Sequence, residues 1–245
     1  MITTMRLDVY LCEKGFCASR TEAKSFIVAG AVTVNGAIIT KAAYQVDDEG
    51  AVIEVDTNVK KFVSRGGLKL EAALDAFSCD PSGASAIDVG ASSGGFTDCL
   101  LKRGAAHVIA VDSGTLQLNE SLRRDERVTS LENYNARFLK RDDLEYVPNF
   151  AVMDVSFISA TYIIPALYDC LSDGADFICL IKPQFEVGKA NVGKGGIVKD
   201  AKAREGALQS VVSFAKGIGF DFLGSITSPI KGGDGNVEYL AHFKK

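Results

Sequence analysis

The sequence of 245 residues is most informative, at first, for what it lacks. It has only two histidines and its six cysteines form no C-x-x-C pair, so zinc-ligand spacing is missing, and we expect no metal and reduced thiols. No apolar run approaches the ~18 residues of a membrane-spanning helix, and the first residues lack the apolar core of a signal peptide. These absences predict a cytoplasmic protein that does not enter membranes, with a monomer as the default state. The net charge is −4, so any surface for nucleic acid must be local.

The stretch AIDVGASSGGFTD, residues 86–98, organises the rest of the chain. An apolar strand runs into a glycine-rich turn and a helix over 96–103 follows, which predicts a βα unit whose turn lets a ligand approach the backbone. Gly90 and Gly95 fit the first and third glycines of a G-x-G-x-x-G dinucleotide fingerprint. Ser92 stands where the second glycine would approach a pyrophosphate, which favours S-adenosylmethionine, a ligand without pyrophosphate. A tight turn without any ligand stays open as an alternative.

A second strand supports the cofactor prediction. Residues 106–112 form an apolar run that ends in Asp112, about 20 residues past the turn, where a carboxylate reaches a ribose diol in nucleotide-binding sheets. The same aspartate would also suit a plain helix cap, so its position alone does not decide. The residues predicted to hold S-adenosylmethionine are Asp88, Gly90, Ala91, Ser92, Gly94, Gly95, Phe96 and Asp112.

From residue 84 onward, apolar strands alternate with helices. The alternation predicts an α/β domain with a Rossmann-like, mostly parallel sheet and helices on both faces. The turn-rich segment SPIKGGDGN separates two strands near the end and suits a closing antiparallel hairpin. The expected strands are 84–90, 106–112, 127–131, 150–155, 175–182, 219–227 and 236–243, and the last helix covers about 200–216.

Residues 5–56 look like a separate, small α+β unit. Ser19 and Glu22 make an S-x-x-E capping box in front of a helix, and Asn35-Gly36 between two short apolar runs predicts a β-hairpin. The periodicity and the turn chemistry together indicate helices packed on short strands.

One face of the capped helix carries Arg20 and Lys24, a spacing that can grip phosphates or simply form a solvated helix face. The pattern L-x-x-Y-L…S-R-x-x-A-x-x-x-I-x-x-G-x-V-x-V-N-G, from Leu7 to Gly36, resembles the RNA-binding domain named after ribosomal small-subunit protein four, here called the S-four-like domain. The resemblance implies that the helix carrying Ser19, Arg20 and Lys24 faces structured RNA.

Ionisable residues lie at or near the ends of the expected strands. Asp154 closes the run AVMD, Lys182 closes DFICLIK, and Glu238 lies in the last expected strand. Lys69 lies on the helix that leads into the sheet. Ligands bind outside the carboxyl ends of such strands, and an ammonium there is costly unless a carboxylate pairs with it. A structural ion-pair network stays open as the alternative to catalysis.

These residues fall within the motifs V-S-R-G-G-L-K-L, D-V-G-A-S-S-G-G-F-T-D, M-D-V-S-F-I-S, I-K-P-Q-F-E and G-N-V-E-Y, and the chain resembles the TlyA (hemolysin-A-like) family. The catalytic domain of that family is similar to the FtsJ-like ribose methyltransferases, which use a Lys-Asp-Lys-Glu tetrad. The resemblance implies 2′-O-methylation of cytidine in ribosomal RNA of the large subunit, and of the small subunit in some members, with S-adenosylmethionine as donor. Ribosomal RNA or ribosomal subunits are the implied partners. The tetrad maps onto Lys69, Asp154, Lys182 and Glu238.

The chemistry gives each member of the tetrad an expected role. A ribose hydroxyl must lose its proton as it attacks a methyl carbon, and a lysine can take that proton only as a neutral amine. We expect Lys182 to act as the base and Asp154 to orient it. Lys69 and Glu238 are then expected to position the ribose.

The segment PQFEVGKANVGKGGIVK, residues 183–199, is expected to be a long functional loop. Its Phe185 has the chemistry to stack on an extruded base, although anchoring the loop is the more ordinary role. The residues expected to contact RNA are Arg6, Ser19, Arg20, Lys24, Arg65, Lys189 and Lys194.

The expected organisation is an S-four-like domain over 1–59, a basic linker over 60–68 and a methyltransferase domain over 69–245. Three alternatives are kept. A nicotinamide-dependent oxidoreductase would share the fold class, a membrane-lytic protein is suggested by the hemolysin name of the family, and an RNA-binding protein could carry an inactive methyltransferase domain.

Overall fold

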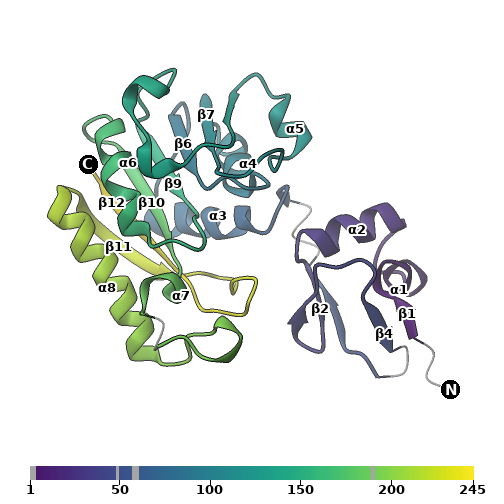
Figure 1. Ribbon diagram of the computed structural model, residues 1–245. Coiled ribbons are helices and arrows are strands. Elements are labelled where there is room, and N and C mark those ends of the chain that lie inside the picture. Colours follow the sequence, from purple (N-terminus) through teal and green to yellow (C-terminus); the bar gives the residue numbers. More distant parts are fainter. Residues whose placement is uncertain (1–3, 48–49, 57–60, 189–190) are drawn as a thin grey trace. The chain divides into compact units, whose positions relative to one another are not determined.

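The computed structural model describes residues 4–47, 50–56, 61–188 and 191–245. The chain divides into two compact units, one up to Arg65 and one from Gly66 onward, and each has its own hydrophobic core (Figure 1). The first helix of the larger unit, α3 (Gly66–Phe77), begins inside the segment expected as linker. The first linker residue, Lys60, lies outside the described residues. The domain limits named above stay a prediction.

The smaller unit packs two helices against short strands. Its core is built from the apolar faces of the helices, with Leu7, Leu11 and Ile27 fully buried. The second helix begins at its predicted cap, because Ser19 Oγ accepts a hydrogen bond of 3.2 Å from the Glu22 amide. The elements are β1 (Thr4–Arg6), α1 (Leu7–Glu13), α2 (Arg20–Val28), β2 (Val32–Val34), β3 (Ala37–Ile38), β4 (Gln45–Asp47) and β5 (Ile53–Val55).

The hairpin predicted at Asn35 and Gly36 is confirmed. These two residues have φ of +52° and +77°, and the flanking Val34 and Ala37 pair antiparallel, as a type I′ turn requires. Strand β5 pairs with the other edge of β2. The antiparallel pair β1 and β4 was not predicted, because three-residue strands leave almost no periodic pattern.

The larger unit contains a seven-stranded sheet in the order β11-β12-β10-β9-β6-β7-β8. The predicted mostly parallel sheet is confirmed: only β12 runs antiparallel to its neighbours β10 and β11. The strand order reverses between β6 and β9, which is the topological switch point of a doubly wound fold. The strands are β6 (Ser85–Val89), β7 (His107–Val111), β8 (Val128–Leu131), β9 (Phe150–Met153), β10 (Asp176–Ile181), β11 (Asp221–Thr227) and β12 (Tyr239–Lys244).

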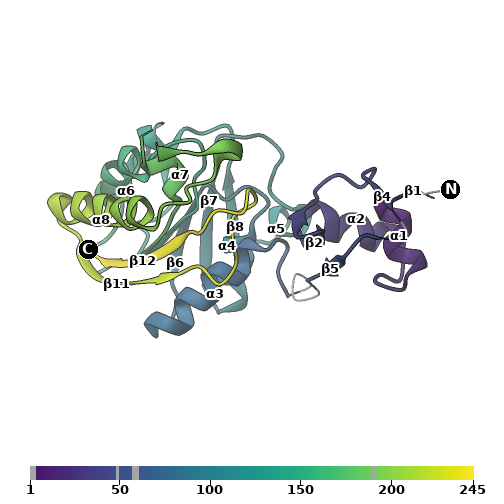
Figure 2. The ribbon, with the colours of Figure 1, turned by 90° about the horizontal axis from the view of Figure 1, so that it is seen from below.

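Helices cover both faces of this sheet. Figure 2 shows α6 and α8 over one face and α3 against the other. Phe177, Phe220 and Phe243 stack among the strands and the final helix, with ring centroids 5.3–6.0 Å apart. No helix within the described ranges has the length and apolar character needed to cross a bilayer. The remaining α-helices are α4 (Gly95–Lys102), α5 (Glu120–Arg123), α6 (Ile164–Cys170), α7 (Pro183–Glu186) and α8 (Ala201–Ile218).

Two local expectations differ from the structure. The segment 183–199 is not a continuous loop, because it opens with the helix α7 and contains the 3₁₀ turn Lys194–Gly196. The carboxylate of Glu186 holds α7 in place by accepting hydrogen bonds from Ser159 Oγ (2.5 Å) and the Ala160 amide (2.8 Å). Glu238 lies just before β12 rather than within it.

Candidate active site

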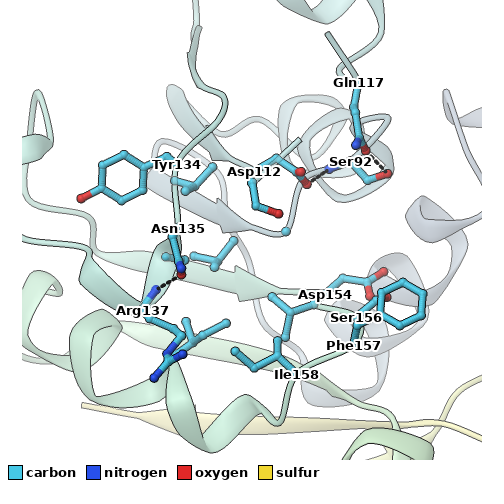
Figure 3. Close-up of a pocket in the computed structure, with 17 residues that line it drawn as sticks. Ser92, Asp112, Gln117, Tyr134, Asn135, Arg137, Asp154, Ser156, Phe157 and Ile158 are labelled. Carbon is cyan, nitrogen blue, oxygen red and sulfur yellow. Dashed lines mark hydrogen bonds between the residues drawn. The ribbon is translucent and has the colours of Figure 1, made fainter. Parts of the chain in front are cut away.

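A cavity of about 500 Å³ opens at the carboxyl ends of β6, β7 and β9 (Figure 3). Gly90 follows β6, Asp112 follows β7 and Asp154 follows β9, and all three line this cavity. It therefore lies where the strand order reverses, the place at which doubly wound sheets bind nucleotides.

The glycine turn is shaped by protein packing as well as by any ligand. A Cβ placed on Gly90, whose φ is +86°, would lie 2.4 Å from the backbone carbonyl oxygen of Asp154. A Cβ on Gly94 would lie 2.3 Å from Leu122 Cδ1. The protein's own packing therefore requires glycine at both positions, and their role in binding a cofactor stays a prediction. Ser92 also adopts a left-handed φ of +49°, so it stands in a glycine-like conformation at the fingerprint position.

Asp112 ties the second strand to this turn. Its carboxylate accepts hydrogen bonds from the amides of Ser92 (2.8 Å) and Gly114 (2.7 Å) while it lines the cavity. Two backbone donors fix the direction of a carboxylate more firmly than solvent can. Figure 3 shows its side chain reaching from the end of the strand into the cavity.

Asp88 lies beneath the turn rather than on the cavity surface. It is fully buried, and its Oδ2 accepts a hydrogen bond of 2.7 Å from Thr97 Oγ1. Burial raises the pKa of the Asp88 carboxyl to about 7, although the Thr97 hydrogen bond opposes that rise. Of the predicted cofactor residues, Gly90, Ser92 and Asp112 line the cavity, whereas Asp88, Ala91, Gly94, Gly95 and Phe96 do not.

Several residues that line the cavity were not predicted. Tyr134, Asn135 and Arg137 follow β8, and Phe157 and Ile158 follow the β9 end. Their position after parallel strands was the available signal, since every such strand ends at the same edge. Glu132 holds the segment 116–118, because its carboxylate accepts hydrogen bonds from the backbone amides of that segment, the one from Leu116 at 2.7 Å. These hydrogen bonds lower the pKa of Glu132.

The four residues of the expected tetrad form two ion pairs. Lys182 Nζ lies 2.5 Å from Asp154 Oδ1 and donates a hydrogen bond of 2.7 Å to Ser156 Oγ. Lys69 Nζ lies 2.6 Å from Glu238 Oε2, and both side chains are almost fully buried. Because Ile181 pairs with Tyr239 across β10 and β12, the adjoining Lys182 and Glu238 leave the sheet at the same edge. Of the four tetrad residues, Asp154 lines the cavity, and Lys69, Lys182 and Glu238 do not.

An aromatic side chain stands at the cavity rim. Phe157 is 91% exposed with φ of +66°, and its ring centroid lies 5.3 Å from that of Phe185. Phe185 thus contacts the segment that follows β9, and its role, in base stacking or in anchoring its loop, stays a prediction. On the β8 side, the Arg137 guanidinium lies 5.2 Å from the centre of the exposed Tyr162 ring.

In the smaller unit, two predicted RNA contacts converge on one buried carboxylate. Asp8 is fully buried and accepts hydrogen bonds from Arg6 Nε (2.9 Å) and Arg20 Nη2 (2.8 Å). Hydrogen bonding to Arg6, followed by that to Arg20, lowers the pKa of Asp8 to about 2 despite its burial. The side chains of Arg6 and Arg20 as a whole stay about half exposed.

The other predicted RNA contacts are more dispersed. Ser19 serves as the cap of α2, and Lys24 is exposed on the same helix. Arg65 lies beside Gly30, and Lys194 is exposed in its 3₁₀ turn. Lys189 lies outside the described residues.

Comparison with known families fits this geometry. The sequence profile described as FtsJ-like methyltransferase matches residues 62–245, and that of the S4 domain matches residues 5–53. The chain belongs to the FtsJ-like methyltransferase family. The predicted pairing of an RNA-binding domain with a methyltransferase of this family is thereby confirmed.

Known proteins are similar to the chain over nearly its whole length. Hemolysin A from Brachyspira hyodysenteriae is 45% identical over 98% of this chain and 99% of its own. The 16S/23S rRNA (cytidine-2'-O)-methyltransferase TlyA from Mycobacterium tuberculosis is 44% identical over 98% of this chain and 90% of its own.

Solved structures agree on the fold. A candidate hemolysin from Streptococcus thermophilus superposes with a TM-score of 0.78 at 44% identity, covering 100% of this chain and 90% of that one. An S-adenosylmethionine-dependent methyltransferase from Mesorhizobium loti, at 14% identity, shares the fold with a TM-score of 0.53 over 71% of this chain and 96% of its own. The larger unit of this FtsJ-like methyltransferase thus has the fold of S-adenosylmethionine-dependent enzymes.

Proposed function

We propose that this protein transfers the methyl group of S-adenosylmethionine to the 2′-hydroxyl of a cytidine in ribosomal RNA. The observation that carries the proposal is the Lys182–Asp154 ion pair at the rim of a nucleotide-type cavity. The 44% identity to a relative named as an rRNA cytidine-2′-O-methyltransferase supports the same reaction. From such a substrate we also infer a cytoplasmic location.

The cavity has the size and the donor set expected for the cofactor. Its volume of about 500 Å³ lies within the range of small-molecule sites. Asp112, already oriented by two amides, is suited to accept hydrogen bonds from the ribose hydroxyls of the adenosine. The backbone of Gly90 and Ser92 would border the methionine part. When bound, the sulfonium supplies an electrophilic methyl carbon.

Lys182 is suited to remove the hydroxyl proton. With the cofactor bound, Lys182 Nζ would accept the proton of the ribose hydroxyl as that oxygen attacks. Lys182 must first be a neutral amine, so its ammonium proton leaves before the step. Asp154 and Ser156 hold the Nζ atom by contacts of 2.5 and 2.7 Å, which fixes its direction.

Lys69 and Glu238 are suited to hold the ribose rather than to exchange its proton. Their contact of 2.6 Å is buried, so each charge already has its partner. A hydroxyl placed beside this pair would meet both a donor and an acceptor in a fixed direction. Correct alignment of oxygen and methyl carbon is itself worth a large factor in rate.

The test is methyl transfer from labelled S-adenosylmethionine to unmethylated rRNA, supplied as naked RNA, as separate subunits and as whole ribosomes. We expect labelled 2′-O-methylcytidine in at least one substrate, located by primer extension. Lys182→Arg should abolish most of the signal, whereas Lys216→Arg, an exposed lysine on α8, should not. Label on a base instead of a ribose, or no label in any substrate, would contradict the proposal.

Membrane lysis is a second candidate, favoured by the 45% identity to a relative named Hemolysin A. Its test is dye release from phospholipid vesicles by the purified protein. Release that is equal for the native protein and Lys182→Arg would indicate a lytic activity separate from methyl transfer.

A further inference from the structure

Away from the cavity, three side chains of ligand type converge in the larger unit. Cys79 Sγ lies 3.8 Å from His242 Nε2, and the same nitrogen lies 2.8 Å from Asp176 Oδ1. All three ligand atoms lie within 4.8 Å of one another. His242 is buried, while Cys79 and Asp176 are partly exposed, so the space between them is sheltered yet reachable.

A nucleophile–base relay does not explain this arrangement. In a Cys-His-Asp relay the nucleophile and the acid sit on opposite ring nitrogens of the histidine. Here the Nε2 atom of His242 faces both Cys79 and Asp176. One sulfur, one nitrogen and one oxygen within 4.8 Å of one another form instead a donor set that metal sites use.

Neighbouring groups already fix two of these ligands in direction. Lys244 Nζ donates a hydrogen bond of 2.8 Å to Asp176 Oδ2, which leaves Oδ1 facing the cluster. Phe77 stacks on the imidazole of His242, with ring centroids 5.2 Å apart. Such outer contacts orient ligands in metal sites and are part of what gives those sites their affinity.

We propose that Cys79, Asp176 and His242 bind a divalent transition-metal ion of the zinc class, with water as the fourth ligand. In a tetrahedral site with metal–ligand bonds of about 2.0–2.3 Å, neighbouring ligand atoms lie about 3.3–3.6 Å apart. The cysteine–histidine separation is already close to that value, and the histidine–aspartate separation must widen by about half an ångström. A thiolate with an imidazole selects zinc over magnesium or calcium.

The thiol must lose its proton for the metal to bind. Burial raises the pKa of Cys79 to about 12, so the metal-free thiol is protonated and its proton passes to solvent when the metal bond forms. The negative charge of Asp176 adds to this rise in the pKa of Cys79, and the positive charge of Lys244 opposes it by a smaller amount.

The position of the cluster connects it to the candidate active site without being part of it. The three ligands follow or lie on α3, β10 and β12. Helix α3 also carries Lys69, β10 ends next to Lys182, and β12 begins next to Glu238. A metal bound here would fasten together the far ends of three elements that position the tetrad. The ligands are too distant in sequence to show zinc spacing, which is why the sequence led us to expect no metal.

The experiment uses the full chain, freed of metal and kept reduced, and titrates it with Co²⁺ as a spectroscopic substitute for zinc. We expect one equivalent to bind with thiolate-to-cobalt charge-transfer absorption that Zn²⁺ then removes. Cys79→Ser should abolish this absorption and weaken binding by more than about 100-fold, since even outer-shell changes cost about 10–100-fold. Asp176→Asn, nearly equal in shape, should weaken binding while the circular dichroism spectrum is kept.

Cys12→Ser is the matched control, because Cys12 is also a partly exposed free thiol but lies in the smaller unit. It should bind Co²⁺ like the native protein. The proposal is overturned if the native protein takes up no Co²⁺ or Zn²⁺ at micromolar concentration. It is equally overturned if the charge-transfer absorption persists in Cys79→Ser or disappears in Cys12→Ser.

Discussion

One charged cluster in each unit shows two opposite ways of holding charge. In the larger unit, the ion pair of Lys69 and Glu238 is withdrawn from solvent. In the smaller unit, Arg6 and Arg20 keep side chains that are 45% and 56% exposed, while the carboxylate that holds them is buried. In a buried ion pair the two charges compensate each other, and the contact fixes the positions of both side chains. An exposed guanidinium held from behind keeps its outward donors for an anion such as a phosphate.

The largest expected effect tests whether a lysine of the larger unit does more than pair. Lys182→Arg preserves the positive charge but gives no usable neutral form, so single-turnover methyl transfer should fall by about 10²–10⁴-fold. Cofactor binding measured by calorimetry should be unchanged. The native protein and Lys182→Arg are compared over a pH series.

Lys69→Arg is the comparison for that experiment, and it should reduce the rate less. If Lys182→Arg keeps a near-normal rate and pH profile while Lys69→Arg does not, the two lysines have exchanged roles.

The next effect measures how much the buried carboxyl of Asp88 destabilises the larger unit when it is ionised. Because burial raises the pKa of Asp88 to about 7 in the folded state, above about 4 when unfolded, the native state holds its proton more tightly. The free energy of unfolding therefore declines as pH rises from about 4 to 7, and the full cost remains above pH 7. Asp88→Asn removes this decline, which amounts to at most about 4 kcal/mol for a shift of about three pH units.

Urea denaturation of native protein and Asp88→Asn at pH 5 and pH 8 measures the difference. A gap between the two proteins that is the same at both pH values would show that Asp88 is ionised at little cost. Thr97→Val, which deletes the hydrogen bond to Asp88, should enlarge the decline.

A smaller effect tests the exposed charges of the first unit. Arg20→Ala should weaken rRNA binding by about tenfold and lower the salt slope by about one, because each phosphate contact releases counterions. Lys24→Ala should lower the slope equally but the affinity less, since no ion pair or hydrogen bond of Lys24 is present among the described side chains to hold it in place. Filter binding over a salt series compares them. An equal loss of rRNA affinity in the two variants would show that the hydrogen bond from Arg20 to Asp8 does not strengthen RNA binding.

The smallest effect concerns backbone rather than charge. Ser92→Gly places the residue best suited to φ of +49° and completes the dinucleotide fingerprint. We expect a gain of about 1 kcal/mol in the free energy of unfolding, because a left-handed backbone costs other residues about that much. S-adenosylmethionine should still bind and nicotinamide dinucleotides should not. Dinucleotide binding by this variant, but not by the native protein, would show that Ser92 alone sets cofactor choice.

Much of the fold could be predicted because local chemistry and overall topology agree. Asn35-Gly36 favours one type of hairpin turn, which is the turn observed. The alternation of strands and helices from residue 84 limits the possible strand orders of the sheet to a few. Asp154, Lys182 and Glu238 stood out as charges at or near the ends of apolar strands, whereas Lys69, on a helix, joined them only through the family resemblance. Their division into two pairs depends on the antiparallel insertion of β12 beside β10, which no local pattern reports.

The parts that were missed depend on contacts between distant segments. In the sequence, Tyr134 and Asn135 look like ordinary loop residues. Only the position of β8 in the sheet shows that they line the cavity. Glu186 lies in a lysine-rich segment of the sequence, yet it is half-buried and accepts hydrogen bonds from Ser159 Oγ and the Ala160 amide. Burial raises the pKa of Glu186, and nothing in its sequence neighbours predicts that burial.

The close approach of Gly90 to the carbonyl of Asp154 matters for anyone who wishes to redesign this protein. The glycine turn at Gly90 packs directly against the backbone of Asp154, with no room for a side-chain atom between them. A library that varies the turn alone would displace Asp154 and would report lost activity that has nothing to do with donor choice. Altered methyl donors should therefore be sought by randomising residues 90–92 and 154–156 together, so that the two loops move as a single unit.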